Sequence, residues 1–157
     1  MASARYGVPI LLSDAFVDAL LLEEHVSCVR RIDCVRLKGS ALRMSLYTYD
    51  CGEAAGYVDG IPGVPGTATS AAPGGTPGQG PDGGGCTGCA FPEYRELFRT
   101  GVDAYVAGDW AAAADTLRKC VAAWPADAPP RVLLAYMDGL GGKAPDDWDG
   151  VRELMEK

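Results

Sequence analysis

The chain has 157 residues, of which 48% are hydrophobic, and its formal net charge at pH 7 is −7. Its 14 Lys and Arg residues are scattered along the sequence, whereas a nucleic-acid surface needs concentrated positive charge. It has no apolar run of ~18 residues that would span a membrane, and its first residues lack a signal-peptide pattern. We therefore expect a cytoplasmic protein with no nucleic-acid partner and no direct membrane insertion.

A Gly- and Pro-rich stretch divides the sequence. Nearly half of the positions between Gly52 and Cys89 are Gly or Pro, and large apolar residues are almost absent after Ile61. Such a composition buries too little surface to offset the entropy of ordering. The sequence thus predicts a disordered linker at 51–90 between two small blocks, 1–50 and 91–157. Each block is shorter than ~70 residues, which is small for an independent core.

The first block begins with a predicted strand and helix. Val8–Leu12 is a short apolar run typical of a buried strand. Ser13 is a suitable helix N-cap, and the apolar residues that follow predict a helix over Asp14–Leu22.

A β-hairpin is predicted next. The segment Val26–Leu37 is rich in β-branched residues, and its alternation breaks around Arg30 and Arg31, which predicts either a bulge or a late start of the strand. Residues 42–48 alternate between apolar and polar side chains, as in a half-solvated strand, and Gly39-Ser40 supplies the turn. The block therefore has the order strand, helix, hairpin.

The second block is predicted to be helical. Apolar positions within 94–105 and 110–124 indicate two antiparallel helices, with Gly108-Asp109 as stop and N-cap. A third helix begins at Pro129-Pro130, and Trp148–Lys157 is expected to form a short terminal helix. Helical periodicity favours core positions for Trp110 and Trp124.

Two motifs of the first block resemble the end of class III adenylate and guanylate cyclase catalytic domains. They are Tyr6-Gly-Val-Pro-Ile-Leu-Leu-Ser13 and, after a helix, Arg31-Ile-Asp-Cys-Val-Arg-Leu-Lys-Gly39, followed by a strand ending at Leu46-Tyr47. The resemblance implies a partial ferredoxin-like sheet of strand, helix and hairpin. Together with the predicted linker and α-helical hairpin tail, this gives an expected α+β fold class.

The resemblance also implies where the chemistry lies. In this family two divalent metal ions, Mg or Mn, activate the ribose hydroxyl and clamp the triphosphate at a dimer interface. The metal-binding aspartates and transition-state residues belong to segments that precede this stretch in the family. We therefore expect no catalytic residue and no metal site in this chain, and a partner that is the rest of a cyclase domain or a homologous cyclase chain.

One family residue matches a position here. The Lys of the family's V-K-G strand contacts the nucleotide triphosphate and corresponds to Lys38. Without the resemblance, a single Lys before a Gly turn is more often a solvated charge. Asp33, in the same motif, is expected to be structural.

The second block resembles one tetratricopeptide repeat, a helical hairpin of about 34 residues. The matching positions are Leu97, Gly101, Ala104, Ala113, Leu117, Cys120 and Pro125. About three repeats are needed to form a stable array, so this single repeat is not expected to form one. Its expected role is a helical tail that binds a protein partner or the parent cyclase.

Three functional hypotheses follow. The first is the C-terminal part of a class III cyclase, inactive alone. The second is a non-catalytic helical interaction module. The third is a small zinc or redox protein that uses Cys86 and Cys89, a CxxC pair that lacks two further ligands at suitable spacing. Free thiols are the more common reading of such a pair.

Overall fold

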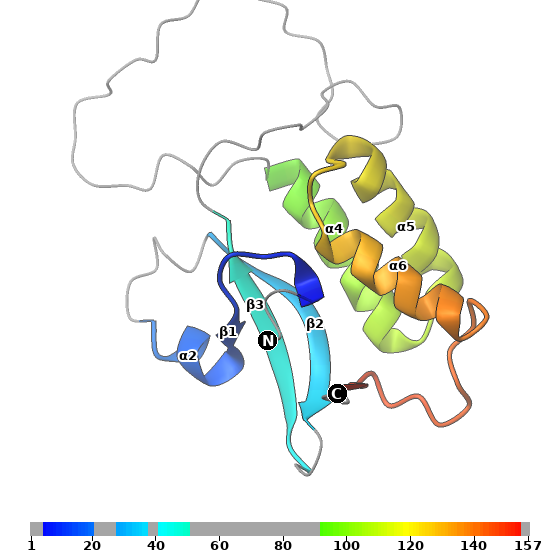
Figure 1. The fold of residues 1–157 in the computed structure, drawn as a ribbon, viewed down its shortest axis with the longest axis horizontal. Coiled ribbons are helices and arrows are strands. Elements are labelled where there is room, and N and C mark those ends of the chain that lie inside the picture. Colours follow the sequence, from blue (N-terminus) through cyan, green and yellow to red (C-terminus); the bar gives the residue numbers. More distant parts are fainter. Residues whose placement is uncertain (1–4, 21–27, 38–40, 51–91, 155–157) are drawn as a thin grey trace, which may run out of the picture.

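The computed structural model describes residues 5–20, 28–37, 41–50 and 92–154, and these parts form a mixed α and β fold (Figure 1). Within them, a four-stranded sheet has the order β1-β3-β2-β4. The longer helices α4, α5 and α6 stand beside the sheet near β2, whereas α2 lies by β1 at the other side. This confirms the predicted α+β class.

The first strand and helix are shorter than predicted. β1 spans Leu12–Ser13 and α2 spans Asp14–Asp18. Pro9 lies in the missing part of the strand, and its lack of an N–H weakens strand pairing. The Ser13 hydroxyl accepts a hydrogen bond from the Phe16 N–H at 3.3 Å, so the predicted N-cap is confirmed. No residue of α2 is buried, and a short helix without a buried face has little to extend it.

The predicted hairpin is present and carries the predicted irregularity. β2 (Val29–Leu37) and β3 (Arg43–Tyr49) pair antiparallel. Their register shifts between Arg31 and Asp33, where the alternation of the sequence breaks. Residues 21–27 and the expected turn at 38–40 lie outside the described residues.

Three helices form the second block, close to the predicted bounds. They are α4 (Pro92–Ala107), α5 (Trp110–Ala123) and α6 (Pro129–Gly139). The Asp109 side chain caps α5 by accepting a hydrogen bond from the Ala112 N–H at 3.1 Å. α6 begins with two prolines, whose fixed φ suits a first turn.

The last described residues form a strand, so the predicted terminal helix over Trp148–Lys157 is wrong. β4 (Arg152–Leu154) pairs in parallel with the last residues of β2, with Val35 opposite Arg152. Gly150 precedes it with a φ of +82°, and a Cβ placed there would lie 2.9 Å from the Val106 carbonyl oxygen. Only glycine fits this approach, which directs the chain away from a helix and onto the sheet.

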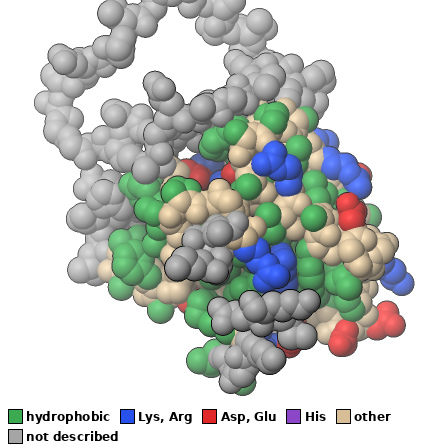
Figure 2. All heavy atoms as spheres, in the orientation of Figure 1, with side chains coloured by type: hydrophobic (Ala, Val, Ile, Leu, Met, Phe, Trp, Pro, Cys, Tyr) green, Lys and Arg blue, Asp and Glu red, His purple; other side chains and the backbone are tan. Residues whose placement is uncertain are grey.

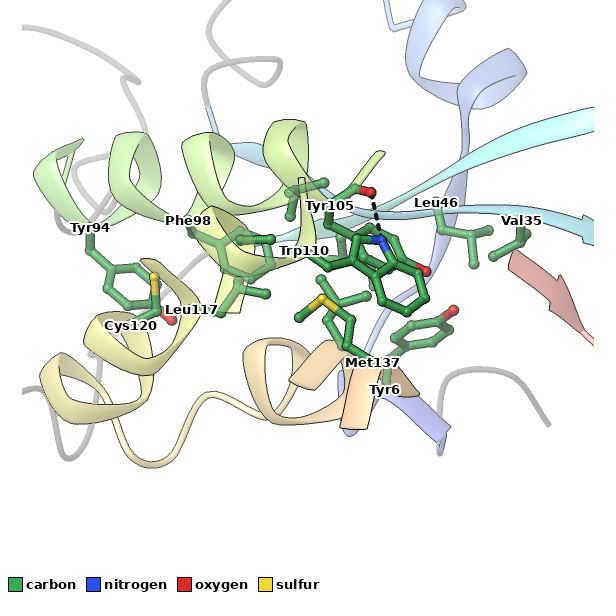
Figure 3. Packing of buried hydrophobic residues seen from close by; sticks show 14 of the residues in the cluster. Tyr6, Val35, Leu46, Tyr94, Phe98, Tyr105, Trp110, Leu117, Cys120 and Met137 are labelled. Carbon is green, nitrogen blue, oxygen red and sulfur yellow. Dashed lines mark hydrogen bonds between the residues drawn. The ribbon is translucent and has the colours of Figure 1, made fainter. Parts of the chain in front are cut away.

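Side chains of both predicted blocks share one hydrophobic core. In Figure 3, Leu46 and Val35 of the sheet lie at one end of a row of side chains that continues to Tyr94 and Cys120. The Trp110 indole N–H donates to the Tyr105 carbonyl oxygen at 3.2 Å inside this row. The row crosses the predicted boundary, so the described parts of 1–50 and 91–157 pack as neighbours. The predicted linker, 51–90, lies outside the described residues.

The surface is mixed in character. On the face drawn in Figure 2, Lys and Arg side chains form separate groups among hydrophobic and acidic ones. None of the helices in the described parts is both long and apolar enough to cross a bilayer.

Candidate functional site

Strand β2 is the element on which the candidate residues converge. Lys38, the predicted triphosphate contact, follows β2 directly but lies outside the described residues. The strand that leads to it is held on both sides, because Val35 pairs with Met44 of β3 and with Arg152 of β4. Two ionic clusters and one pocket are built on the same strand.

The first cluster surrounds Asp33, which is fully buried. The Tyr6 hydroxyl donates to Asp33 Oδ2 at 2.6 Å, and the Cys34 N–H donates to Asp33 Oδ1 at 2.7 Å. Arg152 Nη1 lies 3.5 Å from Asp33 Oδ2, and its guanidinium stacks 4.4 Å from the Tyr136 ring. The cluster joins Tyr6, β2, α6 and β4, so Asp33 acts as a structural centre, in keeping with the expectation from its motif.

The electrostatics of this cluster are set first by burial. Desolvation raises the pKa of Asp33 to about 6, although the Tyr6 hydroxyl and Arg152 act in the opposite direction. Burial and the Asp33 carboxyl also raise the pKa of Tyr6 above its usual range. The phenol therefore stays protonated and remains a hydrogen-bond donor.

The second cluster lies at the other end of β2, around the buried guanidinium of Arg30. Arg30 Nη1 and Nη2 donate to the two carboxylate oxygens of Asp127 at 2.7 and 3.0 Å, a bidentate ion pair. The Tyr94 hydroxyl also donates to Asp127. On its other side, Arg30 Nε is 2.9 Å from Asp50 Oδ2, without the angle of a hydrogen bond.

Aromatic rings complete the surroundings of Arg30. Its guanidinium lies 4.4 Å from the centre of the Phe98 ring and 5.6 Å from that of Tyr94. Burial alone would lower the pKa of Arg30, but the hydrogen bonds to Asp127 and the neighbouring carboxylates raise it. Arg30 therefore remains charged and ties β2 to α4 and to the turn after α5.

A pocket of about 580 Å³ opens between the first half of β2 and the first turns of α4. Its lining combines four arginines with two carboxylates and apolar walls. The lining residues are Val29, Arg30, Arg31, Tyr47, Pro92, Arg95, Glu96, Arg99, Val102 and Asp103. Such an arrangement is suited to anions rather than to cations.

The zinc or redox hypothesis requires metal-ligating or thiol side chains, which can be located only in the described parts of the chain. There, no group of three or more His, Cys, Asp or Glu side chains is placed to hold a metal ion. Cys34 and Cys120 are buried free thiols, and Cys28 is disulfide-bonded. Cys86 and Cys89, the residues of the zinc or redox hypothesis, lie outside the described residues.

Comparisons with protein-family models, curated protein sequences and solved structures found no match for this chain.

Sequence reasoning missed most of the partners in these clusters. It named Asp33 but not Tyr6 or Arg152 as its neighbours, and it gave no role to Arg30 or Asp127. The available signal was the presence of three charged residues, Arg30, Arg31 and Asp33, within an apolar strand, since charged residues are almost never fully buried unless they are paired. Asp127, for example, is 97 residues away from Arg30.

Proposed function

We propose that this chain is the C-terminal part of a class III adenylate or guanylate cyclase catalytic domain, with a helical tail that packs against it. In this proposal, the chain alone makes no cyclic nucleotide, and the complete domain binds Mg or Mn. The observation that carries the proposal is the pair of motifs at 6–13 and 31–39, which occupy the expected order of strand, helix and hairpin.

The position of the second motif gives a physical reason for its residues. In the structure, Asp33 is the buried centre of a polar cluster, and the strand ending before Lys38 has neighbours on both edges. A strand fixed in this way is a suitable support for a phosphate-binding Lys, because precise contacts require rigid elements. The proposed role of Lys38 is to contact the nucleotide triphosphate.

The second hypothesis, a helical interaction module, has a more limited basis. The apolar faces of α4 and α5 contribute Tyr94, Phe98 and Leu117 to the shared core. A partner protein would thus have to bind other surfaces of the tail.

A cyclase assay tests the proposal. The activity is measured with manganese and ATP or GTP, for this chain alone and for a version extended upstream by about 150 residues, roughly one domain. We expect activity only in the extended version. Absence of cyclase activity in both versions would contradict the cyclase assignment. Activity of the chain alone would contradict the proposed dependence on upstream residues.

A pair of variants tests the role of Lys38. In the extended version, Lys38→Ala should lower the rate roughly tenfold or more, because a charged contact to the triphosphate is lost. Lys143→Ala, which removes an exposed Lys from the loop after α6, is the matched control and should leave the rate unchanged. Equal rates for both variants would remove Lys38 from the site.

A further inference from the structure

We propose that the pocket between β2 and α4 binds a small organic phosphate. This binding site is separate from the proposed cyclase function, because it lies at the end of β2 opposite to Lys38 and its binding needs no upstream residues. Three features of the pocket favour this ligand: its concentration of arginines, the contacts that hold them, and its size and walls.

Arginine side chains are concentrated at this pocket, although the chain as a whole is acidic. Four of its 14 Lys and Arg residues line this one pocket, although the chain carries a net charge of −7. Two carboxylates, Glu96 and Asp103, line the same pocket. The guanidinium group presents its N–H donors in a planar fork that matches phosphate oxygens, which makes arginine the typical residue for phosphate recognition.

Two of the arginines are held firmly in the inner wall. Arg30 is buried and neutralised by Asp127 and Asp50, so it forms a rigid part of the inner wall of the pocket. Arg95 donates to the Val29 carbonyl oxygen at 2.6 Å and lies 3.8 Å from Asp50. Burial lowers the pKa of Arg95, although the neighbouring Asp50 carboxylate raises it. An incoming anion would further favour the charged form of Arg95.

The two outer arginines have partners that an anion can replace. Arg31 pairs with Asp103, and Arg99 pairs with Glu96 at 3.0 Å between Nε and Oε2. Glu96 and Asp103 are 62% and 48% exposed, and ion pairs at such solvated positions contribute little stability. A phosphate with two negative charges and several acceptor oxygens can displace these carboxylates and contact both guanidinium groups.

The size and walls of the pocket favour a phosphate attached to an organic group. A volume of about 580 Å³ is far larger than one phosphate ion and falls in the range of small-molecule sites, about 300 to 1,000 Å³. Val29, Val102, Pro92 and Tyr47 supply apolar surface beside the arginines. The N-terminal part of the 16-residue helix α4 also lines the pocket, through Pro92 and Arg95, and the positive end of a helix dipole favours negative charge.

The experiment is a calorimetric titration of the full chain with phenyl phosphate and with inorganic phosphate at matched ionic strength. We expect saturable 1:1 binding, with phenyl phosphate at least about threefold tighter because its ring lies against Tyr47 and Pro92. Absence of saturable binding would overturn the proposal. Equal affinities for the two probes would overturn the assignment of an organic phosphate.

Matched variants locate the site. Arg99→Gln and Arg95→Gln should each weaken binding of phenyl phosphate by roughly fivefold or more, because each removes a charge-assisted contact. Arg118→Gln is the control, since Arg118 forms the same kind of exposed i,i+3 pair, with Asp115 on α5. A loss of affinity in Arg118→Gln as large as in Arg99→Gln would show nonspecific attraction and refute the pocket. Circular dichroism identifies any variant that fails to fold, and Arg99, at 61% exposed, is the safer position.

A variant that is expected to strengthen phosphate binding provides a further test. Glu96→Gln removes a carboxylate that competes for Arg99, so phenyl phosphate should bind about two- to fivefold more tightly. Asp115→Asn makes the same change of charge on α5 and should not alter affinity. Unchanged or weaker binding in Glu96→Gln would contradict the displacement of Glu96 by the ligand.

Discussion

Asp33 is a fully buried carboxyl group whose pKa in the folded chain is about 6, above its ordinary value of 3.8. Burial is the main cause, because removing the carboxylate from water disfavours its charged form. Between these two pH values the folded chain binds more protons than the unfolded chain. Its free energy of unfolding therefore falls as the pH rises through this interval.

This direction of the pH dependence gives a prediction at the residue scale. The difference in free energy of unfolding between the natural chain and Asp33→Asn should shift by about 2 kcal/mol against the natural chain between pH 4 and pH 6.5. At pH 4 both folded chains carry a neutral group at this position, so the shift isolates the titration of Asp33. Urea unfolding at several pH values measures it. A difference that stays constant with pH would mean that Asp33 keeps its ordinary pKa in the folded chain.

At the element scale, β4 is the element whose structural role is hardest to predict from the sequence. It consists of only three residues, yet Arg152 reaches Asp33, and Leu154 contributes to the core. Its pairing also covers the edge of β2 from Val35 to Leu37. An edge strand with unpaired backbone groups is prone to pair with other chains, so β4 also protects the sheet.

Removal of β4 tests this role. A chain that ends at Asp149 loses the strand pairing and leaves the Asp33 carboxyl without Arg152, which should lower the free energy of unfolding by roughly 3 kcal/mol. Backbone amides of Val35–Leu37 should then exchange hydrogen with solvent faster, because their opening costs less free energy. A chain that ends at Leu154 keeps β4 and is the control. Equal exchange rates in both shortened chains would contradict the structural role of β4.

At the scale of the whole molecule, the shared core makes one cooperative unit of the described parts. All three tryptophans of the chain lie in 92–154, whereas Ile32 is in the middle of β2 and fully buried. Because these residues belong to one core or pack against it, a substitution that destabilises the sheet should also destabilise the helices.

Ile32→Ala provides the measurement. The lost side chain leaves a cavity, so the free energy of unfolding followed by tryptophan fluorescence should fall by about 2 to 5 kcal/mol. Leu42→Ala, at a position that is 77% exposed, should change it by less than ~0.5 kcal/mol. A fluorescence transition that does not move in Ile32→Ala would mean that the helices unfold independently of the sheet.

The sequence by itself determined those features whose physical causes are local. Ser13 and Asp109 cap helices because a short polar side chain reaches an N–H three residues on, and two prolines begin α6 because their φ suits a first turn. The period of apolar residues identified the hairpin and the three long helices, and the break in that period located the bulge at Arg31.

The tertiary structure alone decided which distant residues meet. The pairing of β4 with β2, the partner of Arg30 and the arginine-lined pocket all join segments separated by 60 or more positions, such as Val29 and Arg95, which are 66 residues apart. Local propensity carries no information about such contacts, because a buried charge is stabilised only by the particular partner that the folded chain places beside it. For the same reason, local periodicity predicts a helix over Trp148–Lys157, whereas in the fold residues 152–154 pair with the edge of β2 and form the strand β4.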